Sequence, residues 1–202
     1  MKNLILASHS QGKIKEIDKI LKEFGIKVIG VNEFFSMEEV EESANTLKGN
    51  AKIKADFVYN KLKKATLADD TGLFVRALNN KPGVKTARFA GENATDEENR
   101  QKLLDELKNV NDRFAFFETV LYLIDENGNK YTVSGICEGS IAKKEKGEMG
   151  FGYDSIFIPS GSNKTFGELS TEEKNFYSHR ARALKKLNEL LVNILDENRN
   201  SK

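Results

Sequence analysis

Two adjacent aspartates, Asp69 and Asp70, lie in the segment LADDTG, where an apolar run ends in a hydroxyl residue and a glycine. Carboxylates placed in this way are typical ligands of Mg²⁺, which takes one or two carboxylates and completes its shell with water and substrate phosphates. Capping of a turn is the alternative role, because aspartate before glycine often serves that purpose. Since neighbours on a strand face opposite ways, only one of the pair is expected to face a given site.

A polar turn follows the first apolar run and reads SHSQGK from Ser8 to Lys13. Backbone N–H groups at a strand-to-helix turn, together with the helix dipole, favour an anion such as phosphate. Gly12 allows close approach, and Lys13 supplies a compact cation. Many α/β proteins have such a corner without a ligand, and the Walker spacing is absent, so the turn needs support from the rest of the chain.

A glycine-flanked aromatic residue, Phe151, occurs in GEMGFGYDSIFIP and is followed by Tyr153 and Asp154. An aromatic ring on such a loop can stack on a nucleobase, and a neighbouring carboxylate can accept hydrogen bonds from the edge of that base. The start of an apolar strand with a turn aspartate explains the segment equally well.

The segment EEKNFYSHRARAL places Ser178 where it can cap the last helix and puts His179 and Arg180 in the first turn of that helix. Cations at a helix N-terminus oppose the helix dipole, so their presence there suggests that they bind a ligand. Solvated surface charge is the alternative.

Composition indicates an ordinary globular chain. It has 202 residues, 39% of them hydrophobic and 31% charged, with a net charge of +1, so charge alone favours neither nucleic acid nor an anionic membrane as a partner. The single cysteine, Cys137, rules out a disulfide within the chain and fits a buried strand position. No apolar segment approaches the roughly 18 residues that span a bilayer. We therefore expect a cytoplasmic protein without membrane or nucleic-acid partners.

Hydrophobic periodicity predicts an α/β fold in a single domain over residues 1–202. Helices are expected at 11–24, 46–64, 95–108 and 178–195, and capping boxes begin at Thr95 and Ser170. Strands are expected at 3–8, 27–31, 114–125, 130–139 and 153–159, with a strand, a turn and a second strand over 65–75. The alternation of strands and helices early in the chain and the clustered strands later favour a mixed, elongated sheet flanked by helices, in two lobes with a central substrate cleft.

Four motifs occur in the order and at the spacing of the inosine triphosphate pyrophosphatase family: LADDTGLFVRAL, PGVKTARFAG, GFGYD and EEKNFYSHRARAL. The chain resembles this family over nearly its whole length. The resemblance implies a homodimer that binds a purine nucleoside triphosphate such as ITP, dITP or XTP. It also implies a hydrolase that uses Mg²⁺ to convert the triphosphate to a monophosphate and pyrophosphate.

The resemblance also assigns roles to individual positions. Asp70 would bind the metal and activate the attacking water, Asp69 would support it at the metal, and Arg180 and Lys174 would donate to the 6-oxo group of the base. Adenine has an amino group at that position, so it would be rejected. The implied substrate-binding residues are Ser8, His9, Ser10, Gln11, Gly12, Lys13, Lys54, Thr71, Phe151, Gly152, Tyr153, Asp154, Lys174, His179 and Arg180.

Three positions depart from the pattern of the resembled family. Ser10 stands where relatives usually have asparagine, and Lys48 and Gly49 stand where relatives usually have a metal-binding glutamate before Asn50. Glu41 or Glu42 could substitute, but the sequence does not place them. A non-catalytic purine-nucleotide-binding protein with a weakened metal site is therefore the alternative hypothesis. A dehydrogenase is disfavoured because no G-x-G-x-x-G follows the first strand.

Overall fold

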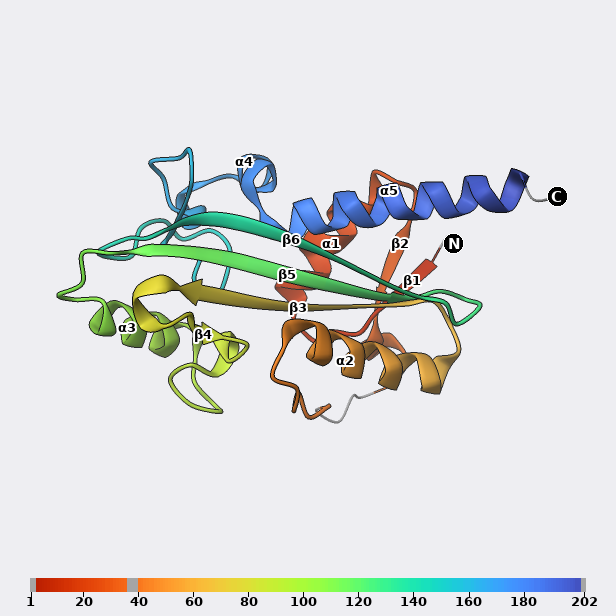
Figure 1. Cartoon of the computed structure of the whole chain (residues 1–202), viewed down its shortest axis with the longest axis horizontal. Coiled ribbons are helices and arrows are strands. Elements are labelled where there is room, and N and C mark those ends of the chain that lie inside the picture. The colour runs from red at the N-terminus through yellow and green to blue at the C-terminus, as the bar shows by residue number, and fades with distance from the viewer. Residues whose placement is uncertain (1–2, 36–39, 201–202) are drawn as a thin grey trace. The chain divides into compact units, whose positions relative to one another are not determined.

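The structure is a computed structural model that describes residues 3–35 and 40–200, with side chains of the last helix described as far as Val192. Helices and strands alternate in the first part of the chain, and long strands follow (Figure 1). The strands are β1 (Asn3–Leu6), β2 (Lys27–Gly30), β3 (Thr66–Val75), β4 (Lys81–Gly83), β5 (Phe114–Ile124), β6 (Lys130–Ile141) and β7 (Phe157–Pro159). The α-helices are α1 (Gln11–Lys22), α2 (Leu47–Leu62), α3 (Asp96–Glu106), α4 (Thr171–Tyr177) and α5 (His179–Asn200).

Within the described residues, seven strands form one mixed sheet in which β2, β1, β3, β5, β6 and β7 are successive neighbours and β4 pairs with β3. β1 is parallel to both β2 and β3, whereas β4 and β7 are antiparallel to their partners. The register pairs Leu6 with Leu67. Asp69 and Asp70 come shortly after Leu67 on β3, so they lie beside the point where the chain leaves β1 and enters the polar turn. The sheet therefore brings the aspartate pair and the polar turn together.

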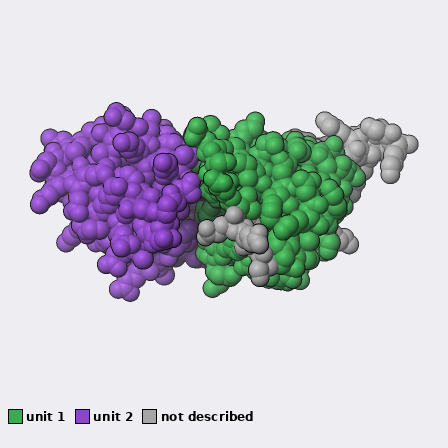
Figure 2. Space-filling view, turned by 90° about the horizontal axis from the view of Figure 1, so that it is seen from below, with its two compact units in different colours: residues 1–70, 119–135, 180–202 green, residues 71–118, 136–179 purple. Residues whose placement is uncertain are grey.

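The chain divides into two compact units, shown in different colours in Figure 2. Unit 1 comprises residues 1–70, 119–135 and 180–202, and unit 2 comprises residues 71–118 and 136–179. The two units match the expected two lobes, and the mixed sheet with flanking helices confirms the predicted fold class. The predicted central cleft stays a prediction.

The core of unit 1 follows from the alternation of side chains along β1. Leu4 and Leu6 pack in a cluster with Ile17 and Leu21 of α1 and with Leu184 of α5. Ile5 and Ala7 pack in a second cluster, which contains Ala51, Ala55 and Val58 of α2. Helices α1 and α5 thus cover one face of this part of the sheet and α2 covers the other, as Figure 1 shows.

The core of unit 2 is built around aromatic rings. Phe117 lies 4.7 Å from Phe157 and 6.4 Å from Phe166, measured between ring centroids. Leu73, Leu103 and other apolar side chains complete the cluster. Cys137 is buried in it, as the sequence predicts. This core supports the loop that carries Phe151, because Tyr153 and Ile156 belong to it.

Local sequence signals agree with most element boundaries. Both predicted capping boxes are present, one at the start of α3 and one at the start of α4. The prediction of two strands over 65–75 is wrong, because β3 is continuous through Gly72. A Cβ atom at Gly72 would lie 2.8 Å from the carbonyl oxygen of Gly83, so this glycine permits the close approach of β4 instead of making a turn. β4 was not predicted, and β7 is shorter than expected.

No helix within residues 3–35 and 40–200 combines the length and the apolar character that crossing a membrane would require.

Candidate functional site

The polar turn after β1 forms a regular helix N-terminus, as predicted. Helix α1 begins at Gln11, with Ser10 as the N-cap residue, and the Ser10 hydroxyl accepts a hydrogen bond from the backbone nitrogen of Lys13 at 3.4 Å. The backbone nitrogen of Ser10 donates in turn to the Ser8 hydroxyl at 3.2 Å. His9 is exposed. Serine and asparagine are about equally good N-caps, so the departure at Ser10 does not disturb the geometry of this turn.

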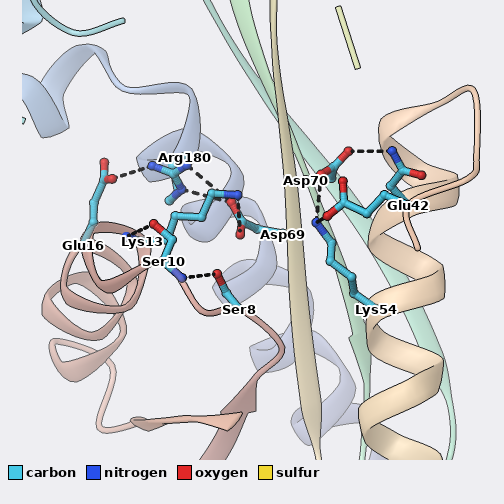
Figure 3. Close-up of polar contacts among 10 residues, drawn as sticks. Ser8, Ser10, Lys13, Glu16, Glu42, Lys54, Asp69, Asp70 and Arg180 are labelled. Carbon is cyan, nitrogen blue, oxygen red and sulfur yellow. Dashed lines mark hydrogen bonds and ion pairs between the residues drawn. The ribbon is translucent and has the colours of Figure 1, made fainter. Parts of the chain in front are cut away.

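Asp69 and Asp70 point to opposite sides of β3 and have different partners (Figure 3). Asp69 is buried and lies among cations: its Oδ1 is 3.1 Å from Lys13 Nζ, and its Oδ2 accepts from Nε and Nη2 of Arg180 at 3.4 Å. Arg180, on α5, also donates through Nη1 to Glu16 on α1. Lys13, Asp69, Arg180 and Glu16 therefore form one charge network in unit 1, which we call the Asp69 network.

The cations of the Asp69 network stabilise the charged form of Asp69. Burial opposes ionisation of Asp69, but Lys13 and Arg180 outweigh burial and hold the pKa of Asp69 well below its usual range. Burial lowers the pKa of Lys13, and the carboxylate of Asp69 offsets part of that effect. Asp69 is therefore a permanently ionised anchor for two cations. This arrangement favours Asp70 over Asp69 as a metal ligand.

Asp70 belongs to a second cluster, on the other side of β3 (Figure 3). Lys54 on α2 donates to Asp70 Oδ1 at 2.8 Å, and the same ammonium lies 3.0 Å from Glu42 Oε1. Asn50 Nδ2 contacts Asp70 Oδ2 at 3.4 Å, and Asn50 Oδ1 accepts from the backbone nitrogen of Ala44 at 3.0 Å. We call Glu42, Asn50, Lys54 and Asp70 the Asp70 cluster.

The Asp70 cluster makes Asp70 unusually basic for an aspartate. Burial raises its pKa, and the nearby Glu42 carboxylate adds to that effect, although Lys54 opposes it. The pKa of Lys54 is raised, because Asp70 and Glu42 together outweigh the effect of its burial. A carboxylate with a raised pKa accepts a proton more readily than an ordinary aspartate.

Close packing explains why glycine occupies position 49. It lies in the first turn of α2, and a Cβ atom there would come within 2.5 Å of Ala44 Cβ and 3.0 Å of Thr46 Oγ1. A larger residue would push away the segment that leads back to Glu42. Gly49 thus lets this segment pack against α2, and the loss of a metal ligand at this position stays a prediction. Lys48 is exposed.

The predicted base-binding residues of unit 2 meet on one loop and one helix. Asp154 Oδ2 accepts from the backbone nitrogen of Phe151 at 2.9 Å and from Lys174 Nζ at 2.8 Å. The Lys174 ammonium lies 5.2 Å from the centroid of the Phe151 ring. Phe151, Gly152 and Asp154 also line a cavity of about 400 Å³. Lys174, Asp154 and Phe151 therefore form a single cation–aromatic arrangement beside a concave surface.

Two other predicted base-pocket residues lie in the core of unit 2. The Tyr153 side chain is buried and its hydroxyl donates to the carbonyl of Thr86 at 2.8 Å. His179 is buried and its ring stacks on Phe117, with centroids 4.7 Å apart. Thr71 is half-buried and begins the unit 2 part of β3. That Tyr153 and His179 contact a base stays a prediction. The contacts of their side chains given above are with other residues of unit 2.

The two residues expected to donate to the 6-oxo group, Arg180 and Lys174, belong to different units, and their joint contact with a base stays a prediction. Arg180 lies in unit 1 with Lys13 and Asp69, whereas Lys174 lies in unit 2 with Phe151 and Asp154. Sequence reasoning missed Glu16 and Asn50 and left Glu42 unplaced. Glu16 could have been noticed one helical turn from Lys13 on the same helix, but its partner Arg180 is 164 positions away, which no local pattern reveals.

The burial of Arg180 predicts a large effect on stability. Arg180→Ala removes the ion-pair partner of Glu16 and one of two cations at Asp69, so the free energy of unfolding is expected to fall by about 3–5 kcal/mol. Urea denaturation followed by circular dichroism measures this. Lys185→Ala, at an exposed position of the same helix, is the control and should change the free energy by less than about 0.5 kcal/mol. A loss of stability in Arg180→Ala as small as that in the control would show that the network adds no stability.

Comparisons with known proteins give one consistent result. A sequence model of the Ham1 family matches residues 4–190. A dITP/XTP pyrophosphatase of Caldanaerobacter subterraneus is 46% identical over 98% of this chain and 100% of its own, and a dITP/XTP pyrophosphatase of Bacillus subtilis is 44% identical over 95% and 98%. The Ham1 protein structure of Staphylococcus aureus matches with a TM-score of 0.84 at 40% identity, covering 95% of this chain and 99% of its own. A HAM1 protein from Coxiella burnetii gives 0.85 at 40% identity, covering 96% and 100%.

Proposed function

Since the chain belongs to the Ham1 family, we propose that it hydrolyses the non-standard purine nucleoside triphosphates ITP, dITP and XTP to the monophosphate and pyrophosphate. The observation that carries this proposal is the Asp70 cluster, in which a buried aspartate and Glu42 share one lysine. Such a cluster provides a base for the attacking water and a pair of carboxylates for a cation, which are two of the recurring parts of sites for phosphoryl transfer.

Magnesium fits the Glu42–Asp70 pair. Two carboxylate oxygens already contact one cationic nitrogen, Lys54 Nζ, at 3.0 and 2.8 Å, so the pair has the charge and the oxygen donors that a hard cation prefers. Among the described residues no group of three or more Asp, Glu, His or Cys side chains could hold a metal, so the remaining ligands would be water and substrate. A bound ion would neutralise charge on the phosphate oxygens.

The residues of unit 1 supply the rest of the chemistry. The carboxylate of Asp70, whose pKa is raised, accepts a proton from the attacking water. Lys54 and Asn50 fix the orientation of that carboxylate through its two oxygens. Lys13 and the N-terminal backbone N–H groups of α1 bind phosphate oxygens. The water oxygen forms a bond to the α-phosphorus, the bond from that phosphorus to the oxygen that bridges to the β-phosphoryl group breaks, and pyrophosphate leaves.

The residues of unit 2 select the base. Phe151 stacks on the purine ring, which does not by itself distinguish one purine from another. An ammonium has three donors, and Asp154 accepts from one of them, so Lys174 can also donate to a 6-oxo group. Adenine carries an amino group at that position, and two donors would then face each other.

A substrate panel tests the proposed specificity. The value of kcat/KM should be higher for ITP and XTP than for ATP by about 10²–10⁴-fold, because a site built to donate to a carbonyl rejects an analogue that cannot accept. Rates are measured with Mg²⁺, and pyrophosphate is scored separately from orthophosphate. Equal values for ITP and ATP would refute this account of base selection.

The alternative, a nucleotide-binding protein without turnover, loses its main support. This alternative rested mainly on the absence of a metal-binding glutamate at positions 48 and 49. Glu42 can supply a carboxylate instead, because it shares the Lys54 ammonium with Asp70. A cytoplasmic location and a homodimer stay part of the proposal. The resemblance to the pyrophosphatase family supports both, and the lack of an internal disulfide fits the first.

A further inference from the structure

Two side chains at the start of α3 hold one residue of the Phe151 loop from both sides. Asp96 Oδ2 accepts from the backbone nitrogen of Gly152 at 2.8 Å. Arg100 Nη1 donates to the carbonyl oxygen of Gly152, also at 2.8 Å. The backbone N–H and C=O of Gly152 are therefore both hydrogen-bonded to side chains of α3. Gly152 directly follows Phe151, so these bonds also restrain the backbone next to the aromatic ring.

The sequence of α3 places these two side chains together. The capping box of Thr95 and Glu98 fixes where the helix starts, so Asp96 is its first residue. Arg100 lies four residues later, which puts it on the same face one turn along. The Arg100 guanidinium is fixed further by Glu145, whose Oε2 accepts from Arg100 Nε at 2.9 Å and from Ser155 Oγ at 2.9 Å.

The loop conformation at Phe151 needs such support. Gly152 has φ of +61°, a left-handed conformation that local backbone preference does not enforce. Within the loop, Asp154 Oδ2 accepts one hydrogen bond from the backbone nitrogen of Phe151 and another from Lys174 Nζ. Phe151 is 37% exposed, so bonds to the loop backbone on both sides of it contribute to the direction of its ring.

We propose that Asp96 and Arg100 are positioning residues for base recognition: they hold Gly152 so that the Phe151 ring keeps the orientation required for stacking on the purine. This inference rests on the proposed function, because it assumes that Phe151 contacts the base. It adds two residues that touch no substrate atom and whose loss should affect binding of the base and spare binding of phosphate.

The test measures binding in the absence of divalent cations, so that no turnover occurs. Calorimetry with ITP and with inorganic tripolyphosphate is performed on wild type, Asp96→Ala and Arg100→Met. Each variant should bind ITP on the order of tenfold more weakly, as expected for losing one charge-assisted hydrogen bond, and should bind tripolyphosphate as wild type does. Amide hydrogen exchange across residues 147–155 should be faster in both variants.

Two further variants separate positioning from general stability. Asp96→Asn keeps an acceptor oxygen and should restore most of the ITP affinity lost in Asp96→Ala. Arg76→Met removes an arginine of unit 2 that makes a comparable two-bond ion pair with Asp112, and it should leave ITP affinity unchanged.

Each contrary result has a distinct meaning. Unchanged ITP affinity in both Asp96→Ala and Arg100→Met, or an equal loss of ITP and tripolyphosphate affinity, would overturn the positioning role. If wild type binds ITP but releases no pyrophosphate when Mg²⁺ is added, the proposed function fails and the positioning role is still decided by the binding data. If wild type does not bind ITP at all, both fail.

Discussion

Replacing Asp70 with asparagine is expected to lower kcat on ITP by about 10²–10⁴-fold, the range that a positioned general base contributes. Asparagine has nearly the same shape but cannot accept a proton at neutral pH or give a cation a full negative charge. The loss should therefore appear in kcat measured at saturating ITP and Mg²⁺.

The fold should tolerate this substitution. Burial raises the pKa of Asp70, which means that the folded protein disfavours its charged form relative to the unfolded chain. A neutral side chain relieves that cost, and Glu42 still pairs with Lys54. The thermal midpoint should stay within about 4 °C of wild type.

Asp69→Asn is the matched control. The pKa of Asp69 is held low by Lys13 and Arg180, so its charged form contributes stability above its unfolded pKa, including at neutral pH. Its loss should lower the free energy of unfolding by several kcal/mol, on the order of that for a broken buried ion pair. Near-normal turnover by Asp70→Asn would remove Asp70 from catalysis, and a thermal midpoint unchanged in Asp69→Asn would contradict its role as an anchor.

Replacing Glu42 with glutamine is expected to raise the Mg²⁺ concentration for half-maximal rate by at least about 10-fold. Even residues that only support the ligands of a metal change metal affinity by about 10–100-fold when mutated, and a direct carboxylate ligand should matter at least as much. Glutamine keeps the size of the side chain and one acceptor oxygen, so contact with Lys54 can persist.

Glu41→Gln is the control for this prediction, because Glu41 is the exposed neighbour of Glu42 on the same segment. Rates are measured over a Mg²⁺ titration at fixed ITP, and the rise in thermal midpoint on adding Mg²⁺ without nucleotide gives a second readout. If both substitutions shift the titration equally, bulk charge explains the effect. If neither does, Glu42 is not a metal ligand.

Local signals in the sequence predicted local structure well. The capping boxes at Thr95 and Ser170 marked helix starts, and Ser10 capped α1 where the polar turn predicted a helix. Strand alternation correctly implied that Asp69 and Asp70 face opposite ways. Each of these inferences depends on residues within about one helical turn or one strand, where spacing alone determines geometry.

Contacts between distant segments could not be predicted in this way. Glu42 meets Lys54 across a loop, and Arg180 meets Asp69 across 111 positions. The sequence also does not show that Ala44 packs against Gly49, a contact that depends on the path of the segment before α2. Family resemblance named Arg180 as a functional residue, but only the fold shows that Asp69 and Glu16 hold it.

The most direct measurement of the central claim is the product analysis of ITP hydrolysis with Mg²⁺. Wild type should release IMP and pyrophosphate in equal amounts without orthophosphate, and Asp70→Asn should release neither at a comparable rate. Formation of IDP and orthophosphate, or equal product formation by both proteins, would contradict the assignment of this chain as a pyrophosphatase that acts through the Asp70 cluster.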